Sequence, residues 1–103
     1  MTGGIRSVPG DAGDMESIQE RFRAEGLTPH SWSNAPGDVY GWHQHDYDKV
    51  LYCVRGGITF HGRDGDVMLT AGDRLEVGAG TEHAATVGSE GVECMEAAVH
   101  RSP

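Results

Sequence analysis

The feature that most constrains the fold is the regular alternation of short apolar runs and glycine-rich turns from residue 30 onward. Turn signals such as APGD (35–38), GRDG (62–65) and GSEG (88–91) separate the runs. Short runs at this spacing are typical of antiparallel sandwiches and barrels. The 16 glycines and only 4 prolines agree with many tight turns between strands. The sequence therefore predicts an all-β fold built as a small antiparallel sandwich or barrel.

The pattern predicts about eight strands. They are expected at residues 30–33, 39–45, 49–54, 58–61, 66–70, 74–77, 83–87 and 92–99. The third of these runs is continuously apolar after its first residue, as expected for a strand covered on both faces. Gly56-Gly57 is expected to form a turn before the fourth strand, and GRDG to close a hairpin.

The N-terminal part of the chain differs from the rest. Residues 1–13 are rich in Gly, Ser, Asp and Pro and are expected to form a flexible tail. From Asp14, which can serve as an N-cap, the spacing of apolar residues becomes helical, and Gly26 can end the helix. The apolar positions are Met15, Ile18 and Phe22. We expect a helix over 14–26, packed against the outside of a β-domain over 27–103.

Charge and composition limit the classes of partner. The formal net charge is -8, and the eight basic residues are scattered along the chain. Nucleic acids and anionic membranes require a basic surface, so neither partner is expected. No apolar run approaches the roughly 20 residues that span a bilayer, and the N-terminus lacks the apolar core of a signal peptide. A cytoplasmic protein is expected.

Two histidines, His43 and His45, stand one residue apart, just before the apolar run 49–54. Residues i and i+2 of a strand point to the same face, so their imidazoles are expected side by side. Such a pair can chelate one metal ion, and it is equally compatible with two surface or core histidines. A third ligand from a distant strand would favour the metal site.

Two stretches resemble the two motifs of the cupin superfamily. The first is Gly41-x-His43-x-His45-x3-Lys49-x6-Gly56, and the second is Gly72-x5-Gly78-x-Gly80-x2-His83-x3-Val87. They are about 15 residues apart, as in small single-domain members, and the strand pattern extends the resemblance to residues 30–99. The resemblance implies a small antiparallel jelly-roll β-barrel with a small-molecule ligand inside. It also implies a metal ion held by His43, His45 and His83.

The chain also departs from the family pattern. Gly41 lies closer to the first histidine than usual, Gly78 replaces a proline, and Val87 replaces an asparagine. The important departure is Lys49, which stands where the family has its metal-binding glutamate. Residue 49 has the same parity as the two histidines, so a regular strand would point its side chain into the barrel.

Three hypotheses for the site follow from Lys49. In the first, the three histidines hold a divalent transition metal (Zn, Fe, Ni, Cu or Mn) with several open positions. Lys49 then lies near the metal without binding it, as a catalytic residue that accepts a proton or holds an anionic substrate. This arrangement is similar to that of three-histidine cupin dioxygenases, in which the acidic ligand is also missing.

In the second hypothesis, a carboxylate replaces the missing glutamate or pairs with Lys49, since a buried charge needs a partner. The candidates are Asp46, Asp48, Glu76 and Glu96. In the third, Lys49 abolishes metal binding. The pocket then binds an organic anion through Lys49, the histidines and either Tyr52 or Arg55.

The remaining candidates are expected to have structural roles. Histidines outside the motifs are expected at the surface or the edge of the core: His30, His61 and His100. Core or dimer packing is expected for Trp32 and Trp42, and the alternative is that they line the mouth of a pocket. Reduced thiols that fill the core are expected at Cys53 and Cys94.

The expected function is that of a metal-binding single-domain cupin. As an enzyme it would be a metal-dependent dioxygenase, or a related lyase or isomerase, acting on a small polar substrate in the barrel. The alternative is a non-catalytic module that binds or senses a small ligand or a metal. A homodimer is expected, because a barrel of about 100 residues with exposed sheet edges can cover them by pairing.

Overall fold

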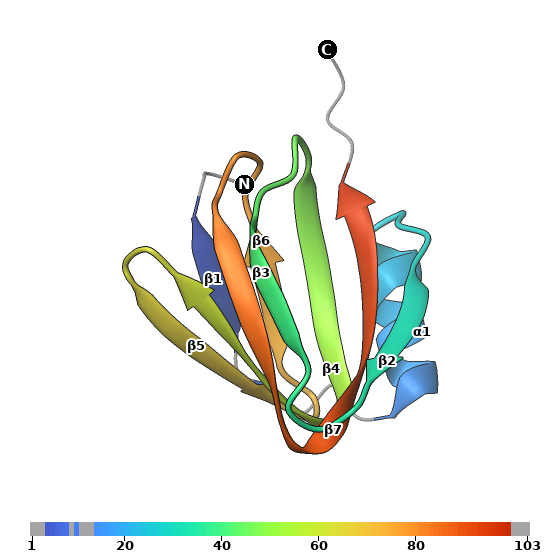
Figure 1. The fold of residues 1–103 in the computed structure, drawn as a ribbon. Helices are drawn as coiled ribbons and strands as arrows, with labels where there is room; N and C mark the ends of the chain where they lie inside the picture. The colour runs from blue at the N-terminus through green and yellow to red at the C-terminus, as the bar shows by residue number, and fades with distance from the viewer. Residues whose placement is uncertain (1–3, 9, 11–13, 100–103) are drawn as a thin grey trace.

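The structure is a computed structural model that describes residues 4–8, 10 and 14–99, and Figure 1 shows its fold. One helix and seven strands occur in the order β1 (Ile5–Val8), α1 (Met15–Ala24), β2 (His30–Asn34), β3 (Val39–His43), β4 (Asp48–Gly62), β5 (Gly65–Thr70), β6 (Arg74–Val77) and β7 (His83–Val99). The described residues contain no helix long and apolar enough to cross a membrane.

The two long strands β4 and β7 organise the sheet. They pair with each other along nearly their whole lengths, from Asp48↔Val99 to Gly62↔His83. The other strands add to them in antiparallel pairs: β6 and then β1 next to one half of β4, β5 next to the other half, and β2 and β3 next to the two halves of β7. Both long strands bend midway, so the sheet folds over on itself (Figure 1). The predicted antiparallel β-fold with a single helix is confirmed.

Two expected turns are bends within continuous strands, so that part of the strand prediction was wrong. Gly56 and Gly91 both adopt positive φ, at 77° and 75°, and the β4–β7 register shifts on either side of Gly56. A Cβ atom at Gly56 would lie 2.0 Å from the carbonyl oxygen of Gly91. The glycines are therefore needed for a close approach of two bent strands, which local sequence cannot distinguish from a turn.

The expected N-terminal tail contains a strand. Residues Ile5–Val8 form β1 and pair with β6, with Ile5 opposite Val77. A strand of four residues has too little alternation to be recognised, and its hydrogen bonds come from the edge of a sheet distant in sequence. The remaining tail residues, 1–3, 9 and 11–13, lie outside the described residues.

The helix agrees with its prediction. The Asp14 side chain accepts a hydrogen bond from the backbone N–H of Ser17 at 3.0 Å, and Gly26 follows the C-cap with positive φ. Ile18 and Phe22 are completely buried. They pack on outward-facing residues of β4 and β7, among them Val50, Tyr52, Val54, Met95 and Ala97.

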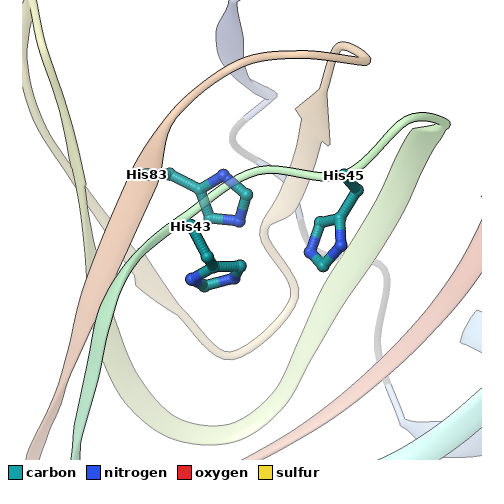
Figure 2. Close-up of side chains that lie close together, drawn as sticks. All are labelled: His43, His45 and His83. Carbon is teal, nitrogen blue, oxygen red and sulfur yellow. The ribbon is translucent and has the colours of Figure 1, made fainter.

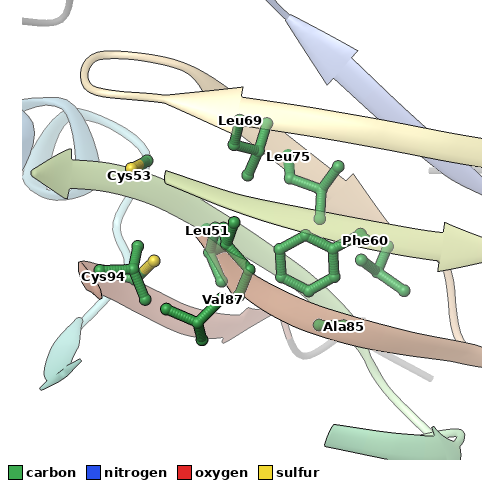
Figure 3. Close-up of a cluster of buried hydrophobic side chains, with 11 residues drawn as sticks. Leu51, Cys53, Phe60, Leu69, Leu75, Ala85, Val87 and Cys94 are labelled. Carbon is green, nitrogen blue, oxygen red and sulfur yellow. The ribbon is translucent and has the colours of Figure 1, made fainter. Parts of the chain in front are cut away.

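The inward-facing residues of β4, β5, β6 and β7 form the main core. It contains Leu51, Cys53, Ile58, Phe60, Leu69, Leu75, Val77, Ala85, Val87, Val92 and Cys94 (Figure 3). Both cysteines are free and buried, as expected. Three members of this core, Ile58, Phe60 and Ala85, lie where it borders the polar candidates.

Candidate metal centre

Three histidines from two distant parts of the chain converge on one space (Figure 2). His43 is the last residue of β3, His45 lies in the segment between β3 and β4, and His83 begins β7. The ring centroid of His83 is 4.3 Å from that of His43 and 5.4 Å from that of His45, and the remaining pair is 5.0 Å apart. One nitrogen from each ring lies within 4.8 Å of the others. The expected meeting of the three imidazoles is confirmed.

Backbone carbonyls set the orientation of two of these rings. His83 Nδ1 lies 2.9 Å from the Thr81 carbonyl oxygen, and His43 Nδ1 lies 2.7 Å from that of Gly41. A carbonyl can only accept, so each Nδ1 carries the proton and each Nε2 keeps a free lone pair. Hydrogen bonds of this kind orient histidine ligands at metal sites.

His83 has a buried ring nitrogen that is suited to bind a metal ion. The side chain is only 1 % exposed, and its Nε2 has no hydrogen-bond partner. Among the described residues it is the one buried side-chain nitrogen or oxygen without such a partner. A buried polar atom left unpaired costs free energy, and an ion bound to the lone pair would remove that cost.

Burial also favours the neutral imidazoles that a metal requires. It lowers the pKa of His83, and the nearby His43 and Lys49 act in the same direction. Burial likewise lowers the pKa of His45, again with help from Lys49. Neutral imidazoles bind Zn, Fe, Ni, Cu or Mn, and three of them leave coordination positions open for a ligand. The cluster is consistent with a site for one such metal.

The three histidines form part of the wall of a cavity of about 250 Å³. The other lining residues are His30, Trp32, Tyr40, Lys49, Ile58, Phe60, Ala85 and Glu96. A cavity of this size accommodates a small molecule beside an ion. Apolar and aromatic side chains make up most of this wall, and the charges are those of Lys49 and Glu96.

Lys49 points into the barrel, as its parity predicted. It is only 6 % exposed, and its Nζ lies 3.6 Å from Oε1 of Glu96. The same oxygen accepts a hydrogen bond of 2.7 Å from the indole Nε1 of Trp32. Oε2 of Glu96 lies 3.9 Å from Nε2 of His30, too far for a hydrogen bond. The ion pair supplies the partner that a buried lysine requires.

Three other carboxylates proposed for the missing ligand lie elsewhere. Asp48 accepts a hydrogen bond of 2.8 Å from the backbone N–H of Ala79, so it anchors the turn before β7. Glu76 bonds to Arg74 on the outward side of β6. Asp46 is exposed and does not line the cavity. Glu96 alone of the four reaches the cavity, where it pairs with Lys49 and stands outside the histidine cluster.

The prediction that Tyr52 or Arg55 contributes to the pocket was wrong, because both side chains point away from the cavity. Tyr52 packs against the helix and its hydroxyl bonds to Arg74, and Arg55 is exposed and pairs with Glu93.

The expectations for the lone histidines and the tryptophans have different outcomes. His30 is exposed and Trp32 packs against the main core, both as expected, and each also lines the cavity. Their approach to Glu96 depends on the pairing of β2 with β7, where His30 lies opposite Glu96. His61 lies away from the cavity, bonded to Asp66 and Thr86. Trp42 is partly exposed under Arg63, and His100 is outside the described residues.

Comparison with known proteins identifies the family. A model of the cupin domain matches residues 30–97, about two thirds of the chain. The chain is a cupin. The match covers β2 to β7, so it includes all three histidines together with Lys49 and Glu96.

Solved cupin-fold structures resemble this cupin over most of its length. A protein from Neisseria meningitidis is 26% identical, covers 73% of this chain and 75% of its own, and has a TM-score of 0.61. KdgF from Halomonas sp. is 22% identical over 73% of this chain and 71% of its own, with a TM-score of 0.61, and this likeness shows the fold alone. A structure of the DMSP lyases RdDddP and RnDddQII is 29% identical over 72% of this chain and 37% of that chain, also with a TM-score of 0.61. No curated protein matches this cupin in sequence.

Proposed function

We propose that this cupin is a metal-dependent enzyme that acts on a small polar, metal-chelating substrate inside the barrel. His43, His45 and His83 hold the metal. The reaction is that of a dioxygenase or of a related lyase or isomerase. The observation that carries the proposal is the unpaired, buried Nε2 of His83, which lies beside two further imidazoles, with one nitrogen of each ring within 4.8 Å of the others.

A bound divalent metal would supply Lewis acidity to a chelating substrate. The residues of the chain provide the apolar surroundings and the charge that position the substrate. Trp32, Tyr40 and Phe60 form the apolar wall that restricts water, and Lys49 places a positive charge in the same cavity. Because Lys49 is paired with Glu96, we propose that it holds the negative charge of the bound substrate and is not the proton acceptor.

The similarity to a structure of DMSP lyases favours an enzyme, at 29% identity over 72% of this chain. The alternative is a non-catalytic module that binds a small ligand or senses a metal. The replacement of the usual glutamate ligand by Lys49 favours that alternative. A panel of chelating acids assayed with metal-loaded protein separates the two. Turnover supports the enzyme, and ligand-induced stabilisation without turnover supports the binding module.

The metal site is tested by elemental analysis of the protein purified without added metal. We expect about one transition-metal ion per chain in the wild type and a loss of at least tenfold in His83→Ala. His61→Ala is the matched control, because His61 also makes two side-chain hydrogen bonds but lies away from the cavity. Full metal content in His83→Ala, or none in the wild type, would contradict the proposal.

We also propose a homodimer. Val39 and Met68 are 70 % and 72 % exposed, on strands β3 and β5, and neither belongs to the cluster that packs against the helix. Exposed apolar side chains of this size are typical of surfaces that associate. Light scattering on the purified chain gives its mass, and a monomer at micromolar concentration would contradict this part of the proposal.

A further inference from the structure

Glu96 has two differently placed oxygens. Oε1 is held by Trp32 at 2.7 Å and faces Lys49 at 3.6 Å. Oε2 makes no hydrogen bond with the described residues, and Nε2 of His30 lies 3.9 Å from it, which is beyond hydrogen-bonding distance. One oxygen is therefore fixed by the protein, and the other is free to accept a proton within the cavity that the three histidines line.

The charges of the cavity constrain what can enter it. Lys49 is buried and, within the described part of the chain, its ion-pair partner is Glu96. Both charged residues line the same cavity as the three histidines. A chelating acid that entered as a preformed anion would add a negative charge next to Glu96. A neutral acid that gave up its proton inside the cavity would leave the total charge unchanged.

We propose that Glu96 accepts the proton of a weakly acidic chelating ligand and that Lys49 then pairs with the negative charge left on that ligand. This inference rests on the proposed function, because it requires a metal at the three histidines. The proton leaves an acidic O–H or C–H group of the ligand and binds Oε2 of Glu96. The electron pair of that bond remains on the ligand as its negative charge. Lys49 thus exchanges one anionic partner for another and stays paired throughout.

The step gives the two charged residues separate roles. Glu96 is the catalytic residue that takes the proton. Trp32 and Lys49 are positioning residues, because they hold Oε1 and so direct Oε2 toward the ligand. The substrate class follows: a small chelating acid that is neutral when it enters the cavity and loses its proton on binding. The unusual lysine at the position of the family's glutamate is then explained by a carboxylate supplied from β7.

The test uses zinc-loaded wild-type protein and acetohydroxamic acid, a small chelating acid with one ionisable proton. Titration calorimetry in buffers of different ionisation enthalpy counts the protons released per binding event. At neutral pH we expect the wild type to release close to none, because Glu96 retains the proton. Glu96→Gln should release about one, and its affinity should rise about tenfold per pH unit where that of the wild type is nearly constant.

Two outcomes would overturn the proposal. One is an equal proton count in the wild type and Glu96→Gln, and the other is a failure of the zinc-loaded wild type to bind the hydroxamate. Glu93→Gln is the matched control, because Glu93 lies on the same strand and pairs with the exposed Arg55 away from the cavity. Zinc content measured before the titration distinguishes this failure from that of the proposed function. Wild-type protein that retains no zinc overturns the metal site itself, and this inference with it.

Discussion

The two halves of the barrel interior are built from the same two strands, yet they differ in chemistry. In the closed half, inward residues of β4 to β7 such as Leu51, Cys53, Leu75 and Cys94 are completely buried and apolar. In the cavity half, the next inward positions of β4 and β7 are Lys49 and Glu96, which lie close to the histidine cluster. The Cys53↔Cys94 pair and the Leu51↔Glu96 pair are only two residues apart along the paired strands.

The difference indicates that one half of the barrel stabilises the fold and the other half forms the binding site. Burial of apolar side chains stabilises the closed half in proportion to the area removed from water. In the cavity half, each buried polar group costs free energy unless it is paired. Lys49 is paired with Glu96, whereas the Nε2 of His83 has no hydrogen-bond partner among the described residues. We therefore expect substitutions in the closed half to affect folding and those in the cavity half to affect binding.

The largest effect on folding is expected from Leu75→Ala. Leu75 has no exposed surface and packs in the centre of the apolar cluster, so the substitution leaves a cavity. The free energy of unfolding should fall by about 2–5 kcal/mol, measured by urea denaturation of the metal-free protein. A loss below about 1 kcal/mol would show that the closed half is not the main source of stability.

A smaller effect is expected from Glu96→Gln, which leaves Lys49 without its ionic partner. The free energy of unfolding should fall by about 1–3 kcal/mol. Adding Lys49→Met to Glu96→Gln should recover part of that loss, because the unpaired charge is removed. Glu93→Gln breaks a pair with an exposed arginine and should cost less than about 1 kcal/mol. Additive effects of the two cavity substitutions would contradict the pairing.

The smallest effect is a pH dependence of the metal-free protein. Burial lowers the pKa of His83 from its usual 6.5, so between the folded and unfolded pKa values the unfolded chain binds more protons. Stability should therefore be full above about pH 6.5 and fall as the pH decreases through that window. Thermal unfolding from pH 7.5 to 5 measures the slope, and His83→Ala should flatten it. An unchanged slope in the variant would assign the dependence to other groups.

Local sequence features predicted much of this molecule. The cap at Asp14, the spacing of Ile18 and Phe22, and the GRDG hairpin each depend on neighbouring residues, and the structure contains all three. The short strand β1 and the continuity of β4 and β7 were missed, because hydrogen bonds to distant strands determine them. The two bends at Gly56 and Gly91 exist only where the long strands approach each other.

The candidate site divides in the same way. The sequence by itself determined that His43, His45 and His83 could be ligands and, through strand parity, that Lys49 points inward. Only the tertiary structure decided which carboxylate meets Lys49, since Glu96 reaches it across the pairing of β4 with β7, and Trp32 and His30 arrive from β2. The physical reason is that side-chain direction follows from local backbone geometry, whereas the partner of a buried charge depends on how distant strands close into a barrel.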